Sequence, residues 1–171
     1  DAGLDNVTFQ EGDASDLSGV DDDSFDLTFS CFGAMFAPKP FDVAKEMVRV
    51  TKTPGGRIVM GNWIPNDETS FVSQLLKISA AFSPPPPEGF ISPVTWGVES
   101  HVVERFGEAG VSEDQIEMVK AVFLFRSPDV STADYTDAFI NYYGTTINAY
   151  EAAKADGKDD DLRSDLAALD T

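Results

Sequence analysis

A strand, a helix and a second strand follow one another between residues 25 and 63, and this order constrains the fold most. Apolar and polar residues alternate over 25–30, which is typical of a half-buried strand. Apolar residues then recur at helical spacing over 41–51, and the Pro-Gly-Gly turn at 54–56 ends that helix. The continuous apolar run at 57–63 favours a parallel strand that is buried on both faces. These patterns predict a βαβ unit and an α/β fold.

Helical patterns dominate the remainder of the sequence, interrupted by a proline-rich segment and a β-rich run. Four consecutive prolines at 84–87 form a stiff polyproline stretch, which is either a loop that props a lid or a ligand for a proline-binding module. Residues with high β-propensity predict strands at 7–10 and 115–126. Periodic apolar residues predict helices over 67–82, 99–110, 132–153 and 156–171.

The sequence is strongly acidic, with 30 Asp and Glu residues against 12 Lys and Arg residues and a formal net charge of −18. This charge argues against nucleic acid and anionic lipid as partners, because both carry dense negative charge. Two origins of the charge stay open: adaptation to high salt, or an ordinary acidic protein with an acidic tail. Because no apolar run reaches the length of a transmembrane helix, we expect no membrane partner.

The cysteine content limits the possible cross-links, metal sites and cellular location. Cys31 is the only cysteine, so neither an internal disulfide nor a cysteine-rich metal site can form, and we expect no metal. A reducing, cytoplasmic location is the simplest expectation for such a chain. The polar and acidic first residues do not resemble a secretory signal.

Three segments carry a family pattern in their order and spacing. Residues 6–14 end in Gly-Asp-Ala, residues 23–37 hold the alternating strand and the loop after it, and residues 46–57 hold the helix end and the Pro-Gly-Gly turn. Together they resemble the middle of class I S-adenosylmethionine-dependent methyltransferases of the ubiquinone-biosynthesis-like type. The resemblance implies a partial Rossmann-like methyltransferase sheet that lacks the first strands and carries helical lid segments.

The resemblance also implies how the chain is organised and which side chains it uses. One partial domain would span 1–171, with a cofactor-side core at 1–65 and lid or substrate segments at 66–100 and 127–155. Asp13 would accept a hydrogen bond from the adenine amino group of S-adenosylmethionine, and the Ala14 backbone N–H would bond an adenine ring nitrogen. The remaining implied cofactor residues are Ser30, Cys31, Phe32 and Phe36, and the implied substrate-pocket residues are Met35 and Trp63.

Each of these roles has a purely structural alternative. Asp13 can simply cap a turn, and Cys31 suits a small buried hydrophobe better than a nucleophile. The cluster of Phe32, Met35 and Phe36 can be core packing. His101, the sole histidine, suits a surface or capping role better than that of a general base. We therefore name no catalytic residue.

The resemblance places several family features outside the sequence. The first strand, the glycine-rich loop that holds the methionine end of the cofactor, and the acidic residue that holds the ribose would all precede Asp1. Only the contacts to the adenine end are then expected here. A closing antiparallel strand after 162–171 is also not expected.

Two functions follow as expectations. The first is methyl transfer from S-adenosylmethionine to an unidentified small molecule, by a fragment that is inactive alone. The alternative is a non-catalytic, self-associating module, in which exposed strand edges pair with a second copy in a strand-exchanged dimer. A different Rossmann-like nucleotide binder, such as a dehydrogenase, is a third reading without a glycine fingerprint.

Overall fold

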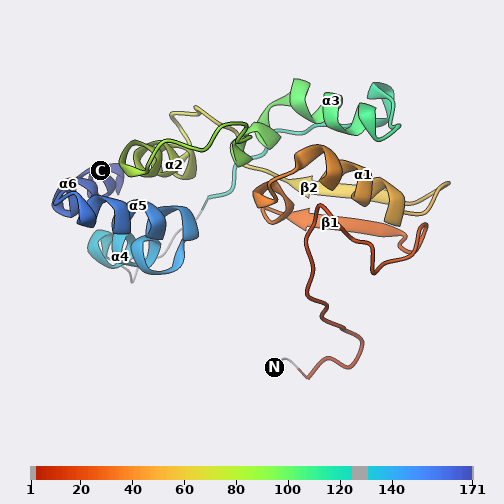
Figure 1. Ribbon diagram of the computed structural model, residues 1–171, viewed down its shortest axis with the longest axis horizontal. Helices are drawn as coiled ribbons and strands as arrows, with labels where there is room; N and C mark the ends of the chain where they lie inside the picture. The colour runs from red at the N-terminus through yellow and green to blue at the C-terminus, as the bar shows by residue number, and fades with distance from the viewer. Residues whose placement is uncertain (1–2, 125–130, 171) are drawn as a thin grey trace. The chain divides into compact units, whose positions relative to one another are not determined.

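The computed structural model describes residues 3–124 and 131–170, and these residues divide into two compact units. Unit 1 comprises Asp1–Asn62 and Ile91–Glu117, and unit 2 comprises Trp63–Phe90 and Met118–Thr171. Unit 1 contains both strands, whereas unit 2 is helical (Figure 1). The expected mixture of α and β structure is therefore confirmed.

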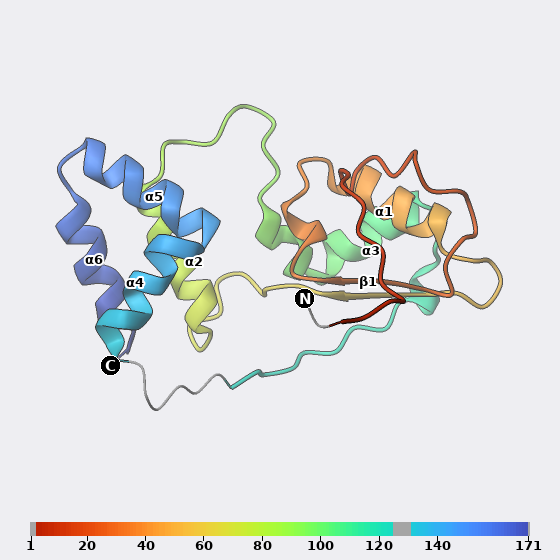
Figure 2. The ribbon, with the colours of Figure 1, turned by 90° about the horizontal axis from the view of Figure 1, so that it is seen from below.

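The βαβ unit predicted from the sequence is present in unit 1. β1 (Leu27–Cys31) and β2 (Arg57–Gly61) are parallel, and Leu27 lies opposite Arg57 at one end of the ladder and Cys31 opposite Gly61 at the other. The connecting helix, α1 (Pro40–Val50), lies on one side of this sheet (Figures 1 and 2). Its bounds follow from Pro40 at the first helical position and an extended Thr51 at the end.

A 3-10 helix and a second α-helix contribute to the core of unit 1. η2 (Pro93–Gly97) is a 3-10 helix that leads into α3 (Glu99–Glu108), and α3 packs against α1. The rings of Trp96 and Phe106 meet edge to face with centroids 6.0 Å apart. α1 contributes the other large share of this core, with Val43, Ala44, Met47 and Val50 buried.

The other side of the two-stranded sheet is open. Leu27, Phe29 and Val59 point away from α1, and Phe29 is 64% exposed. The prediction that 57–63 is buried on both faces is therefore wrong, and β2 ends at Gly61. Among the described residues no third strand pairs with either edge, so the sheet offers hydrogen-bonding groups and an apolar face together.

Unit 2 is a cluster of helices around an apolar core. Its helices are α2 (Phe71–Phe82), α4 (Thr132–Tyr142), α5 (Gly144–Ala155) and α6 (Asp159–Ala167), shown together in Figure 2. Apolar side chains from all four meet in the centre. The buried members of this core are Leu75, Ile140, Ala149, Ala153, Leu162 and Leu166.

Several predicted boundaries shift because local capping decides them. The helix predicted over 67–82 begins at Phe71, since the Ser70 side chain accepts a hydrogen bond from the Ser73 backbone N–H. The single helix predicted over 132–153 is two helices, because Tyr143 is extended with φ −102° and ψ 109°. Chain direction changes there, between α4 and α5.

Both of the outlying predicted strands are wrong over the described residues. Residues 7–10 form no strand, and Phe9 is exposed. Residues 116–124 belong to no strand and pair with no strand of the described chain, and Val119, Val122 and Phe123 lie exposed. The rest of that predicted strand, 125–126, is outside the described residues. A strand needs a hydrogen-bonded neighbour, and β-propensity alone does not supply one.

Candidate functional site

The carboxyl ends of β1 and β2 form the edge at which open α/β sheets bind ligands. The chain leaves β1 through Phe32, whose backbone N–H donates to the Gly61 carbonyl at 2.9 Å. Phe32 has φ +57°, an uncommon conformation for a side chain of its size. The Ser30 hydroxyl then accepts a hydrogen bond from the Ala34 backbone N–H at 2.9 Å. These bonds fix the course of the loop directly after the strand.

The end of β1 and this loop contain most of the predicted cofactor residues. Ser30 and Cys31 end the strand, and Phe32 and Phe36 lie on the segment after it, with Cys31 and Phe36 exposed. Met35, which lies in the 3-10 helix η1 (Ala34–Phe36), is only 1% exposed and belongs to the core. Its packing matches the structural alternative, and a place for Met35 in a substrate pocket stays a prediction.

Asp13 forms a tight turn. Its Oδ1 accepts hydrogen bonds from the Ser15 backbone N–H at 2.8 Å and from the Ser15 hydroxyl at 2.7 Å. The backbone bond from Ser15, followed by the hydroxyl bond, lowers the pKa of Asp13, and the nearby Lys39 ammonium adds a smaller lowering. Lys39 directly precedes the first residue of α1. The turn thus presents an acceptor carboxylate whose pKa is lowered.

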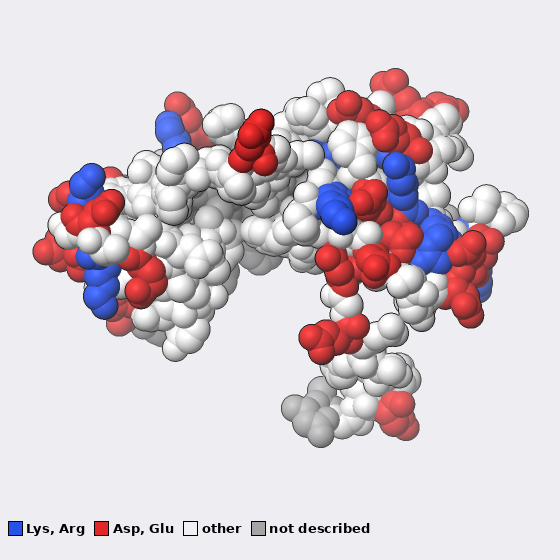
Figure 3. All heavy atoms as spheres, in the orientation of Figure 1, with Lys and Arg blue, Asp and Glu red and all other residues white. Residues whose placement is uncertain are grey.

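Arg49 fastens the acidic stretch after this turn to α1. Its guanidinium donates to the Leu17 and Val20 carbonyls at 2.8 Å and to Asp22 Oδ1 at 2.6 Å. It also bonds both carboxylate oxygens of Glu46 at 2.8 Å, which lowers the pKa of Glu46. Figure 3 shows acidic side chains gathered over unit 1 in this view, with basic ones set among them. This network holds the segment that carries Asp13.

Unit 1 also buries a cation, Arg105, which the sequence reasoning missed. Arg105 is 2% exposed; its Nη2 donates to Thr95 Oγ1 at 2.6 Å, and its guanidinium lies 4.6 Å from the centre of the Trp96 ring. Burial lowers the pKa of Arg105, against a smaller opposing effect of Glu104. η2, which holds Thr95 and Trp96, packs against η1. Helical spacing places Arg105 three residues after Val102, but a charged residue at such a position is ordinarily expected at the surface.

Two predicted residues lie elsewhere in the chain. Trp63 is half-buried and is the second residue after β2, but it belongs to unit 2, and its pocket role stays a prediction. His101 is 45% exposed on α3, with Nδ1 3.5 Å from a Glu104 carboxylate oxygen, as a surface histidine would be. Over 3–124 and 131–170, no three His, Cys, Asp or Glu side chains group as metal ligands, and no helix is long and apolar enough to cross a membrane.

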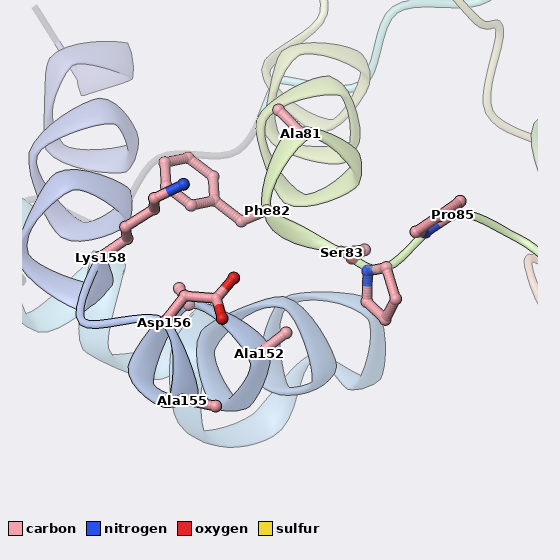
Figure 4. A pocket seen from close by; sticks show the side chains of 10 residues that line it. Ala81, Phe82, Ser83, Pro85, Ala152, Ala155, Asp156 and Lys158 are labelled. Carbon is pink, nitrogen blue, oxygen red and sulfur yellow. The ribbon is translucent and has the colours of Figure 1, made fainter.

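Unit 2 has a pocket of its own between the ends of α2 and α5 (Figure 4). Alanines and Phe82 form much of its wall, and Asp156 and Lys158 supply charged groups. A second hollow beside α2 is lined by Asp67, Gln74 and Lys77. None of the predicted site residues lines either hollow.

Comparison with known proteins gives a family for the first part of the chain. A family model described as "Methyltransferase domain" matches residues 1–60, which include the Asp13 turn, the loop after β1 and most of β2. No solved structure matches the chain.

Related sequences come from mycobacteria. The chain is 33% identical over 134 residues to the uncharacterized protein Rv1403c of Mycobacterium tuberculosis, which covers 75% of this chain and 44% of that protein. It is equally similar to the uncharacterized protein Mb1438c of Mycobacterium bovis. The uncharacterized protein Rv1405c of M. tuberculosis is 32% identical over 144 residues, covering 84% of this chain and 49% of its own length. The chain thus spans less than half the length of these relatives. Residues 1–60 belong to the methyltransferase domain family, as the resemblance of their motifs predicted.

Proposed function

We propose that unit 1 binds the adenine end of S-adenosylmethionine, and that the protein transfers the methyl group to a small molecule. The observation that carries this proposal is the Asp13 turn, in which two hydrogen bonds from Ser15 hold an acceptor carboxylate whose pKa is lowered. The match of residues 1–60 to the methyltransferase domain family supports it.

The residues present fit the chemistry of adenine. An exocyclic amino group needs an acceptor, and a carboxylate such as Asp13 accepts without offering a competing proton. The neighbouring ring nitrogen needs a donor, which the Ala14 backbone N–H would supply. Phe32 and Phe36 would flank the ring from the loop after β1, where aromatic faces also favour a sulfonium. When bound, S-adenosylmethionine supplies an electrophilic methyl carbon.

Orientation, rather than proton transfer, would be the contribution of these residues. A well-placed nucleophile gains most of its rate from proximity and alignment, so a general base is not required. His101, paired with Glu104 on the surface of α3, is assigned no step. We further propose that this chain grips the adenine end only and does not turn over by itself, because its residues include no glycine-rich loop for the methionine end.

Calorimetric titration with S-adenosylmethionine tests the proposal. We expect binding at micromolar Kd, and Asp13→Ala should abolish it because the only carboxylate for adenine is lost. Asp16→Ala is the matched control, since Asp16 Oδ1 likewise accepts a backbone N–H, from Ser18 at 3.1 Å, in an exposed turn. Binding that survives Asp13→Ala, or that is equally lost in Asp16→Ala, would reject the adenine assignment.

A second candidate function has its own observation. The open face of the sheet, with Leu27, Phe29 and Val59, lies beside unpaired strand edges. We propose that the chain self-associates through this face and these edges, because burying them removes apolar area and satisfies backbone groups. Sedimentation velocity should show a dimer at micromolar concentration, and a compact monomer at that concentration would reject this candidate.

A further inference from the structure

The guanidinium of Arg105 is buried without an anionic partner. Nη2 is bonded to the Thr95 hydroxyl, whereas Nε and Nη1 have no hydrogen-bond acceptor within the part of the chain that the structure describes. A buried charge normally has a counter-charge or a full set of hydrogen bonds, because removing it from water is costly. Arg105 has neither a counter-charge nor a full set of hydrogen bonds, which indicates that it binds a ligand.

The position of this guanidinium is fixed by its neighbours. The Thr95 hydroxyl donates its single proton to the Ser92 carbonyl at 2.6 Å, so it can only accept from Arg105. One face of the guanidinium lies over the Trp96 ring at 4.6 Å, and Phe106 holds that ring in turn. The edge that carries Nε and Nη1 is therefore held in one orientation before any ligand arrives.

Contacts of η2 link Arg105 to the segment that follows β1. η2 packs against η1, which follows β1, and Asn62 directly follows β2. The Asn62 Oδ1 is also buried, and it too has no hydrogen-bond partner among the described residues. Asn62 thus leaves the carboxyl end of the sheet, where ligands bind in this class of fold, while Arg105 lies on α3 and contacts Thr95 and Trp96 of η2.

We infer that Arg105 binds the carboxylate of a small molecule through Nε and Nη1. One guanidinium neutralises one negative charge, so a buried monoanion leaves no net charge, whereas a phosphate or sulfate dianion would leave an uncompensated one. A planar carboxylate also matches the planar donor edge of arginine. Identification of this molecule as the methyl acceptor rests on the proposed function, but carboxylate binding by Arg105 does not.

Thermal unfolding of the full chain with benzoate as the probe tests the inference, and benzamide serves as its uncharged analogue. At a benzoate concentration ten times its Kd we expect Tm to rise by about 4 °C, and benzamide should have no effect. Arg105→Met should remove the benzoate shift. Lys45→Met, which removes an exposed cation of the same unit, should retain it. An equal shift with benzamide, a shift retained in Arg105→Met, or no shift up to about 50 mM benzoate overturns the inference.

A second measurement uses the wild-type chain and a variant that keeps the positive charge. It therefore tests the inference even if Arg105→Met does not fold. In a proton–nitrogen correlation spectrum of the wild-type chain, the arginine Nε resonance that disappears in Arg105→Lys belongs to Arg105. Benzoate should shift this resonance in a saturable way, while benzamide leaves it unchanged. A resonance that ignores benzoate, or that responds more strongly to sulfate at equal ionic strength, rejects the carboxylate. Because no cofactor is added, these results are independent of the titration with S-adenosylmethionine.

Discussion

The two units of this chain solve the same problem, the burial of an apolar surface, to different extents. In unit 2, helices surround Leu75, Leu162 and their neighbours, so the apolar core is closed within the described residues. In unit 1, α1 covers one side of the β1–β2 sheet, while Phe29 and Val59 face outward on the other. A helix cluster is complete when the apolar faces of its helices pack together, whereas a sheet has two faces to cover and two edges whose backbone groups need hydrogen bonds. The comparison predicts that substitutions of core residues in unit 2 lower stability, and that substitutions on the open sheet face of unit 1 weaken association.

The largest expected effect lies in the closed core of unit 2. Leu162 is 0% exposed, so Leu162→Ala should lower the free energy of unfolding by about 2–5 kcal/mol through lost burial and a cavity. Urea unfolding followed by circular dichroism measures this change. Val122→Ala, at a side chain that is 87% exposed, is the control and should change stability by less than about 0.5 kcal/mol. Equal costs at both positions would mean that the core is not closed.

A smaller effect is expected on the open sheet face, and on association rather than folding. Phe29→Ser should weaken self-association at least roughly tenfold, because an exposed aromatic ring would be the main apolar contact of a dimer. Sedimentation velocity gives the dissociation constant, and urea unfolding of the monomer should change little. Tyr142→Ser, at an exposed ring of unit 2, is the matched control. If both variants associate like the parent chain, the open face is not an interface.

Next in size is the attachment of the acidic stretch to α1. Arg49→Met removes the bonds to the Leu17 and Val20 carbonyls and leaves Glu46 without its cation. Limited proteolysis of residues 14–24 should become several-fold faster, because local opening is no longer opposed. Lys52→Met breaks one exposed pair with Asp26 and should leave the cleavage rate unchanged. Unaltered cleavage in Arg49→Met would show that the network does not order this segment.

The smallest effect concerns the pH dependence of unit 2. The Lys120 ammonium, 2.8 Å away, and bonds from Thr69 lower the pKa of Asp67 to about 2. Because the folded pKa is below the unfolded one, the stabilisation is complete above the unfolded value and is lost as pH falls through about 2. Asp67→Asn should therefore flatten the dependence of Tm on pH between about 4 and 2. Glu68→Gln, an exposed neighbour, should keep the parent slope.

Sequence periodicity predicted the elements that are long and locally consistent. The βαβ unit and α2 were found because alternation, helical spacing and the Pro-Gly-Gly turn all agree over 25–82. The break at Tyr143 was missed because apolar spacing continues across it. The strand predicted at 115–126 failed over its described part because pairing is a property of neighbours in space.

Only those residues of the candidate site that belong to a family motif could be predicted from the sequence. Gly-Asp-Ala at 12–14 and the loop after Ser30 could be named from their order in the sequence. Arg105 could not, because a charged residue on a helix is expected at the surface, and only the packing of Trp96 and Thr95 reveals its burial. Motifs thus identified the residues that we propose for the cofactor, and the structure added the buried cation of α3.

The chain reversal at Tyr143 also bears on how unit 2 assembles. Because α4, α5 and α6 are consecutive and contact one another, most of their contacts join residues that are close in sequence. α2 is separated from these helices in the sequence by residues 83–131, so its contacts with them join residues that are far apart in the chain. Low contact order favours early formation, so we expect the three consecutive helices to associate first and α2 to close the core last. The extended Tyr143 thus influences the order in which the helices of unit 2 associate, as well as their arrangement.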